Sequence, residues 1–252
     1  MSGAAFEGLE KALAGRETAE DYTPGDRGYA TEMFAEIMQW YGDEESLYSG
    51  WPRRVSRFSA AIRKGMGPAF SPQRFLDDVV CATALADQNP YLVGRFFDTV
   101  VQSLYDLGGN DLVIGLAQLG SSALVSLGYN LRGTESRLLR ATYVDAPVHF
   151  FGGGSSEHCV LTLDGDALVI GEIASHAEFT VTGKSDLESL GKMATGCTFR
   201  IADLYAGGYP VPKGWPYCQN AYLNELLVEN RNTLFRKDAE GAWVEVDAGW
   251  RA

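Results

Sequence analysis

Three stretches in the second half of the chain repeat nearly the same eight residues. HCVLTLDG begins at His158, HAEFTVTG begins at His176, and GCTFRIAD begins at Gly196, so the period is first 18 and then 20 residues. A unit of this length is too short for a strand plus a helix, but it matches one coil of a β-solenoid. One coil cannot bury its own apolar face, which explains why the pattern is repeated.

Each unit contains a short strand in which apolar residues alternate with polar ones. In a solenoid, equivalent residues of successive coils stack at the strand spacing of about 4.8 Å. Leu163, Val181 and Ile201 are therefore predicted to form one internal ladder. The alternative is an ordinary antiparallel sheet in which the similarity of the three strands has no spatial meaning.

Glycines recur at fixed places beside these strands. Gly153, Gly171 and Gly191 are predicted to stack at a corner that needs a positive φ or a close turn. The segment 127–133, LGYNLRG, is similar to 190–196, LGKMATG, and is a faint fourth copy of the same unit.

The glycine pattern carries a resemblance to known solenoids. It consists of Gly165, Gly171 and Gly183 around Phe179 and Val181, followed by Gly191 and Gly196 before Phe199 and Ile201. Over residues 150–205 this resembles the repeated Gly-x-x-Gly-x-Gly pattern of the right-handed solenoid domain of glutamate synthase, and the solenoid chain of formylmethanofuran dehydrogenase is similar. The third copy departs from the pattern, with Asp203 in place of glycine. The resemblance implies a domain that organises neighbouring catalytic parts, and it carries no catalytic residue over to this chain.

A second resemblance competes with the first. Residues 170–175 and 190–195 each fit one hexapeptide of the left-handed acyltransferase solenoids. In those folds the hexapeptides follow one another without interruption, whereas here the next hexapeptide positions fall on His176 and Thr182, which are not aliphatic.

The first half of the chain has the apolar spacing of helices. The pattern predicts helices over 29–41, from Pro72 onward and from Pro90 onward, and a further buried helix over the apolar run 112–128. That run is short for a membrane span and contains polar residues. We therefore predict an α+β protein: an N-terminal helical bundle in a domain of residues 1–133, and a short β-solenoid in a domain of residues 134–252. A helix from Asn220 and a hairpin around 233–246 are predicted to cap the solenoid at its C-terminal end.

One segment departs from the acidic average of the chain. No carboxylate occurs between Glu45 and Asp77, and helical geometry places Arg53, Arg57 and Lys64 on the side opposite to the apolar residues of the segment. A basic face of this kind is often only solvated or paired with nearby acidic helices. As a functional site, it would dock an acidic partner or a phosphate-bearing ligand.

Charge and cysteine usage bound the partners and the compartment. The formal net charge of −12 argues against affinity of the whole surface for nucleic acid or anionic lipid. The N-terminus shows no signal-peptide pattern, and the four cysteines form no Cys-x-x-Cys pair. We expect a cytoplasmic protein that neither binds a membrane nor carries a cofactor. The sequence leaves open whether the chain forms a homo-oligomer.

His158 and His176 occupy equivalent repeat positions and are the candidates for chemistry. Stacked on adjacent coils they could share a metal ion or act as acid and base, although a polar corner ladder is the commoner explanation. The nearby turn Gly152–Gly154 could present N–H groups to an anion. The sequence thus predicts a non-catalytic scaffold or protein-interaction protein. The alternative is an enzyme or a ligand- or metal-binding protein that uses the two histidines; no catalytic residue is assigned, and enzyme status stays open.

Overall fold

The computed structural model describes residues 51–65, 70–84, 90–117, 124–145, 148–205 and 222–249. The helices are α3 (Trp51–Gly65), α4 (Pro72–Ala84), α5 (Pro90–Asp106), the 3-10 turn η3 (Leu187–Ser189) and the π-helical η4 (Asn224–Glu229). The strands are β1 (Leu112–Gly115), β2 (Leu124–Leu127), β3 (Leu139–Val144), β4 (Val148–Phe151), β5 (Cys159–Asp164), β6 (Ala167–Ile170), β7 (Glu178–Asp186), β8 (Thr198–Tyr205), β9 (Thr233–Lys237) and β10 (Trp243–Glu245).

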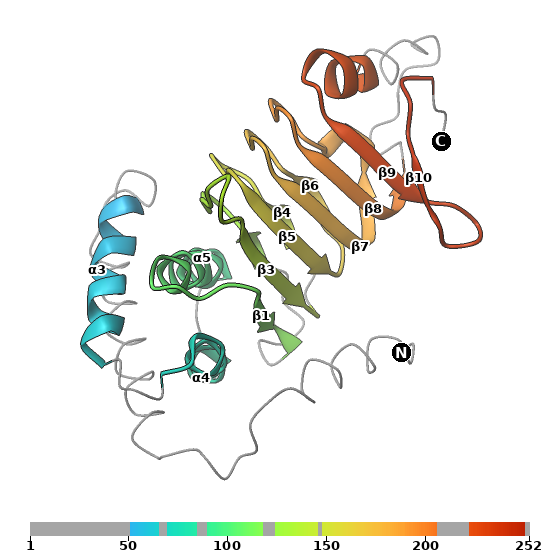
Figure 1. The fold of residues 1–252 in the computed structure, drawn as a ribbon. Helices are drawn as coiled ribbons and strands as arrows, with labels where there is room; N and C mark the ends of the chain where they lie inside the picture. The colour runs from blue at the N-terminus through green and yellow to red at the C-terminus, as the bar shows by residue number, and fades with distance from the viewer. Residues whose placement is uncertain are drawn as a thin grey trace.

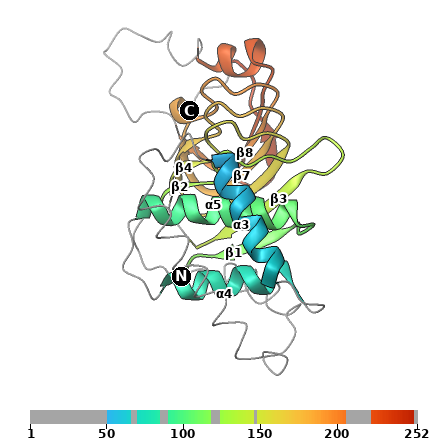
Figure 2. The same ribbon diagram turned by 90° about the vertical axis from the view of Figure 1, so that its left-hand side faces the viewer.

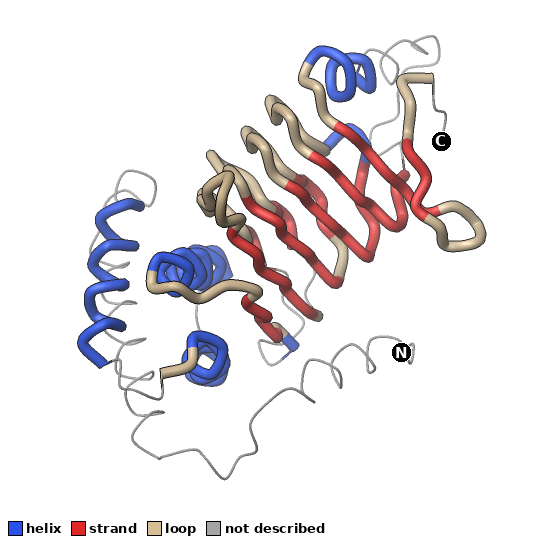
Figure 3. The backbone as a smooth tube through the Cα atoms, in the orientation of Figure 1, coloured by secondary structure: helices blue, strands red, loops and turns tan. Residues whose placement is uncertain are grey.

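The strands form a β-solenoid of about four turns (Figures 1 and 3). One sheet has the order β1-β3-β5-β7-β8-β9-β10, and a second sheet has the order β2-β4-β6. All neighbours are parallel except β9 and β10, which form an antiparallel hairpin. The three repeated strands β5, β7 and β8 pair in parallel, so the antiparallel alternative is wrong.

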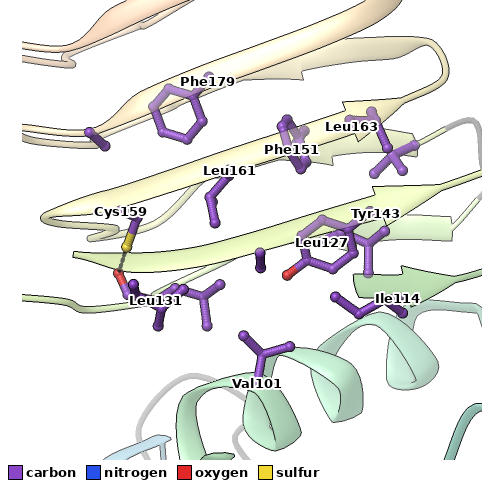
Figure 4. Packing of buried hydrophobic residues seen from close by; sticks show 14 of the residues in the cluster. Val101, Ile114, Leu127, Leu131, Tyr143, Phe151, Cys159, Leu161, Leu163 and Phe179 are labelled. Carbon is purple, nitrogen blue, oxygen red and sulfur yellow. Dashed lines mark hydrogen bonds between the residues drawn. The ribbon is translucent and has the colours of Figure 1, made fainter. Parts of the chain in front are cut away.

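The predicted internal ladder is confirmed by the strand register. Leu163 pairs with Val181, Val181 pairs with Ile201, and all three side chains are buried. A second ladder beside it carries aromatic rings: Phe179 and Phe199 stack with their centroids 5.4 Å apart and their planes 19° apart. Figure 4 shows Leu163 and Phe179, one member of each ladder, in the same core as Val101 of α5 and Ile114 of β1.

The stacked corner glycines are Gly152, Gly171 and Gly191, so the prediction was one residue off at Gly153. Phe151 pairs with Ile170, and Ile170 with Leu190, which places the following glycines in register. The corner at 152–156 holds one residue more than the corner at 171–174. Gly152 has a φ of +68°, and a Cβ there would lie 2.0 Å from Cε1 of Phe179, so glycine is required on both grounds.

The buried helix predicted over 112–128 is wrong. The described ends of this run are strands β1 and β2, which pair with β3 and β4. An apolar run without clear periodicity fits a buried strand as well as a buried helix, and here the neighbouring coil decides. The faint fourth copy in the same region is real, because Leu127 pairs with Phe151 and its corner glycine has a φ of +72°.

The described helices cover the first coil, and the predicted helical bundle is not confirmed. Helix α5 packs on β2, α4 packs on β1, and α3 lies across α5 (Figure 2). Gly94 allows the close approach of α5, because a Cβ there would lie 1.9 Å from the carbonyl oxygen of Ser126 in β2. The helix predicted over 29–41 lies outside the described residues.

Side chains from the helices satisfy the backbone of the first coil. In later coils, the corner N–H of Gly152, for example, donates to the Leu127 carbonyl of the preceding coil over 2.8 Å. Gly128 has no preceding coil, and its N–H donates instead to the Asp98 carboxylate of α5 over 2.6 Å. Gln102 of α5 takes the same role beside it, since it accepts from the Arg132 N–H (2.7 Å) and donates to the Arg132 carbonyl (3.0 Å).

The C-terminal helix and hairpin lie at the other end of the solenoid, as predicted. Strand β9 pairs with β8, and β10 folds back on β9. Buried Asn232 accepts from the Cys197 N–H over 2.8 Å and donates to the carbonyls of Ala194 and Leu226. The Tyr222 hydroxyl donates to the Leu190 carbonyl. At this end of the stacked corners, too, a side-chain amide thus bonds to backbone groups that would otherwise face a further coil.

None of the helices in the described part of the chain combines the length and the apolar character that crossing a bilayer requires. Strands β1 and β2 precede residue 133 and pair with strands that follow it. The division into two domains at that residue stays a prediction.

The corner glycine Gly152 provides a test of the stacking. We expect Gly152→Ala to lower the free energy of unfolding by at least about 2 kcal/mol, because it adds a steric clash to an unfavourable φ. Gly241→Ala is the matched control, since Gly241 has a φ of +83° but an added Cβ would meet no atom within 4 Å. Urea denaturation of both variants measures the difference. Equal losses would contradict close packing of Phe179 at the corner.

Asp98 provides a test of the helical cap. Burial raises the pKa of this carboxyl from 3.8 to about 7, against the opposing effects of Arg95 and of the N–H donors of Tyr129 and Gly128. Between these two pH values the folded state binds more protons than the unfolded state, so its stability decreases as the pH rises from about 4 to about 7.

We expect Asp98→Asn to reduce this pH dependence, by up to about 4 kcal/mol between pH 4 and pH 7.5. Chemical denaturation of both proteins at the two pH values measures it. Asp111→Asn is the control, because it removes an exposed carboxylate. The stability of this variant should depend on pH as that of the wild type does. An Asp98→Asn variant with an unaltered pH dependence would show that Asp98 is ionised throughout this range.

Candidate interaction site

Helix α3 presents an apolar face to α5 and a basic face to solvent. Val55, Phe58 and Ile62 are buried, and the Phe58 ring meets Phe96 of α5 edge-on with centroids 6.2 Å apart. The buried Ser103 hydroxyl of α5 also donates to the Val55 carbonyl over 3.3 Å. The predicted amphipathic helix is therefore present, and its apolar side fixes its rotation about its own axis.

Two of the three basic residues predicted from the sequence fall on the outer side of α3. Arg53 and Arg57 are one helical turn apart, and both are exposed. Lys64 belongs to α3, but its side chain lies outside the described part of the structure. The structure thus places Arg53 and Arg57 on one exposed face, and the binding of a partner there stays a prediction.

A pocket of about 840 Å³ adjoins this basic face. It lies between α3, the C-terminal half of α5 and the corner column of the first coils. Its lining consists of Pro52, Val55, Ser56, Ser59, Ala60 and Arg63 from α3, Gln102 and Asp106 from α5, and Tyr129, Asn130, Arg132, Gly154, Ser155 and Ile173 from the corners. Arg63 is exposed and marks where the pocket wall meets the basic face of α3.

Buried polar contacts fix the pocket wall formed by Tyr129. The guanidinium carbon of buried Arg95 lies 3.4 Å from the centroid of the Tyr129 ring, and the Asp98 carboxylate accepts the Tyr129 N–H over 3.1 Å. Gln102 holds Arg132 and also donates to Asp106 over 3.0 Å. The wall opposite α3 is therefore rigid, because the bonds that hold it also cap the solenoid.

The turn Gly152–Gly154 forms one of the solenoid corners, and three N–H groups in and just after it have internal partners. The Gly152 N–H donates to the Leu127 carbonyl, the Ser155 N–H donates to Asn130 Oδ1 over 2.9 Å, and the Ser156 N–H donates to the Gly154 carbonyl. These three donors are not available to an anion, and the binding of an anion by the turn stays a prediction. Gly154 and Ser155 contribute to the pocket as lining residues.

His158 and His176 are brought together, as the repeat predicts. Their rings stack with centroids 5.5 Å apart and planes 12° apart, and Nε2 of His158 lies 3.7 Å from Glu157 Oε1. Both residues have a φ near +50°, a conformation for which histidine is enriched among non-glycine residues. Lone pairs of parallel rings point in parallel directions, so the two histidines would have to rotate to share one ion.

No protein-family model matches the chain. The searches of curated proteins and of solved structures also find no significant match.

Two cysteines at equivalent repeat positions are structural. Cys159 and Cys197 are buried and unpaired with each other, and the Cys159 thiol donates to the Leu131 carbonyl over 3.0 Å (Figure 4). Burial raises the pKa of the Cys159 thiol to about 12 and also raises the pKa of Cys197. A protonated, buried thiol is a poor nucleophile.

The sequence reasoning missed the pocket and its residue Ile173. The alignment of the repeats contained a signal, because Ile173 and Met193 occupy the third corner position, where the first two corners have Asn130 and Gly154. The pocket residues Gln102 and Arg63 come from helices, and no repeat relates them to the solenoid.

The histidine pair gives a direct test of the metal-binding alternative. Among the described residues, no group of three or more His, Cys, Asp or Glu side chains could hold a metal ion. Since structural zinc sites use four ligands, we expect the purified protein to hold far less than one zinc or iron ion per chain. Elemental analysis measures this. Stoichiometric metal that is lost in His158→Ala/His176→Ala but retained in His149→Ala would instead establish the alternative.

Proposed function

We propose that the protein is a non-catalytic interaction protein, or scaffold, that docks an acidic segment of another protein on the basic face of α3. Arg53, Arg57 and Lys64 provide this face. The observation that carries the proposal is that Arg53 and Arg57 are exposed on a helix whose opposite side is packed against α5. The charges are thus held in a fixed position.

Charge distribution favours an acidic partner at this face. Guanidinium groups bind carboxylates through paired hydrogen bonds, which suits exposed arginines one helical turn apart. The net charge of −12 leaves the rest of the surface unattractive to an acidic segment. At physiological salt, charges are screened beyond about 8 Å, so a local group of arginines acts without the opposing charge of distant residues.

The rigidity of the scaffold favours docking over catalysis. A partner that binds a preorganised helix face loses less free energy to ordering of the protein. The glycine pattern of 150–205 is similar to that of the glutamate synthase solenoid domain, which organises neighbouring catalytic parts. We extend that role to this chain, in the cytoplasm, as part of the proposal. The stacked His158 and His176 support the alternative of a ligand- or metal-binding protein, which the metal measurement distinguishes.

Charge reversal of α3 tests the proposal. We expect Arg53→Glu/Arg57→Glu to weaken binding of an oligoglutamate peptide, used as the acidic probe, at least about tenfold, because attraction becomes repulsion. Binding of the wild type should also fall as salt is raised. Fluorescence anisotropy of the labelled peptide measures both effects.

Lys184→Glu/Lys237→Glu is the matched control, since it makes the same change in net charge at exposed positions of β7 and β9. We expect it to reduce binding by much less than the α3 variant. If both variants lose binding equally, net charge and not the basic face of α3 controls the interaction, and the proposal is wrong.

A further inference from the structure

The third position of each solenoid corner has a left-handed backbone. It is occupied by Asn130, Gly154, Ile173 and Met193 in successive coils, with φ values of +60°, +65°, +62° and +62°. Glycine and asparagine adopt this conformation readily, whereas a β-branched residue such as Ile173 is a true outlier there. The first two corners thus carry fitting residues and the last two carry strained ones.

Burial in the folded chain does not offset this strain. Ile173 is 47% exposed and Met193 is 58% exposed. By contrast, Asn130 uses its side chain locally, because its Oδ1 accepts the Ser155 N–H over 2.9 Å. An asparagine or glycine would therefore serve the fold better at both positions. Strained residues that the core does not require are expected where a surface has a function.

Ile173 and Met193 occupy the same position of neighbouring corners, and Ile173 lines the pocket. The Ile173 N–H donates to the Lys192 carbonyl over 2.9 Å, so Ile173 and Met193 belong to directly adjacent corners. Ile173 also lines the pocket, together with Arg63 and Ser59 of α3. The corner side of the groove thus presents an aliphatic side chain at Ile173, and the α3 side leads to the basic face.

We infer that Ile173 and Met193 are the apolar anchors of the docking groove, and that its occupant is an acidic amphipathic segment of another protein. This inference rests on the proposed function and specifies the partner. Aliphatic or aromatic side chains of the segment would pack on Ile173 and Met193, and its carboxylates would reach Arg63 and the basic face of α3. A few apolar anchors surrounded by polar contacts are the usual arrangement of a binding hot spot.

The test uses the full chain and a random-peptide display library as the probe. Peptides selected on the wild type should combine Asp or Glu with Leu, Ile, Phe, Met or Trp. The best of them, made synthetically, should bind Ile173→Asn/Met193→Asn at least about tenfold more weakly. Leu168→Asn is the control, because Leu168 is an equally exposed aliphatic residue on β6 outside this pocket, and it should retain binding.

Stability separates a lost contact from a lost fold. Asparagine suits the left-handed backbone, so the Tm of Ile173→Asn/Met193→Asn should equal that of the wild type or exceed it by about 2–4 °C. A lower Tm would overturn the inference, because the aliphatic side chains would then serve the fold.

Two further outcomes also overturn the inference. Selected peptides that are basic, or purely apolar, would assign the groove a different partner. Acidic amphipathic peptides that bind Ile173→Asn/Met193→Asn as tightly as the wild type would show that the corner pair is not an anchor. If Arg53→Glu/Arg57→Glu still weakens the binding of those peptides, the proposed function stands without this inference. If neither variant weakens their binding, the proposed function and this inference are both wrong.

Discussion

A parallel β-solenoid has two open ends, and the backbone groups of its terminal coils must find partners outside the repeat. In this chain the partners are polar side chains. Gln73 of α4 accepts the Val113 N–H over 2.9 Å and donates to the Val113 carbonyl over 2.7 Å, so one amide imitates an adjacent strand at β1. Asp98 and Gln102 do the same at the first corner, and Asn232 does so at the last. The helices are therefore required by the solenoid, because they hold these side chains in place.

The candidate site depends on that same set of bonds. Helix α5 meets β2 closely because Gly94 carries no side chain. The Asp98 carboxylate and the Gln102 carboxamide of α5 bond to the backbone of the first corner. Helix α3 then packs on the opposite side of α5 through Phe58 and Ile62. Arg63 of α3 and the corner residue Ile173 thus both line one groove, whose walls are held by the contacts that terminate the solenoid. A mutation that loosens the cap is expected to affect binding and stability together.

The sequence predicts what depends on local periodicity and fails where distant residues decide. The ladder of Leu163, Val181 and Ile201 follows from spacing alone, because equivalent residues of a repeat must stack. The run 112–128 is different, because its apolar residues fit a helix or a strand equally well. Pairing with β3, which the local sequence does not show, decides for the strand. The C-terminal cap was predicted, but the side-chain bonds that close the N-terminal end were beyond reach, because the bond from Gln73 to Val113 joins residues 40 apart in the chain. Arg53 and Arg57 were found because amphipathic helices have a readable period. The pocket beside them was not found, because its walls come from two helices and the solenoid corners, which no sequence pattern relates.

The corner turn itself shows where such a fold can acquire a function. Its first position faces the core: a Cβ at Gly152 would overlap the Phe179 ring, so this position is fixed by packing. At Ile173 and Met193 the third position has the same left-handed backbone but an exposed side chain, so the side chain strains only the local backbone. Substitution of Ile173 or Met193 therefore changes the surface of the solenoid without disturbing the ladders. Each added coil repeats the position one strand spacing further along, so a short solenoid can present a row of side chains to a partner at a regular interval of about 4.8 Å. A strand or helix surface of the partner with matching apolar residues can then engage the row at several points.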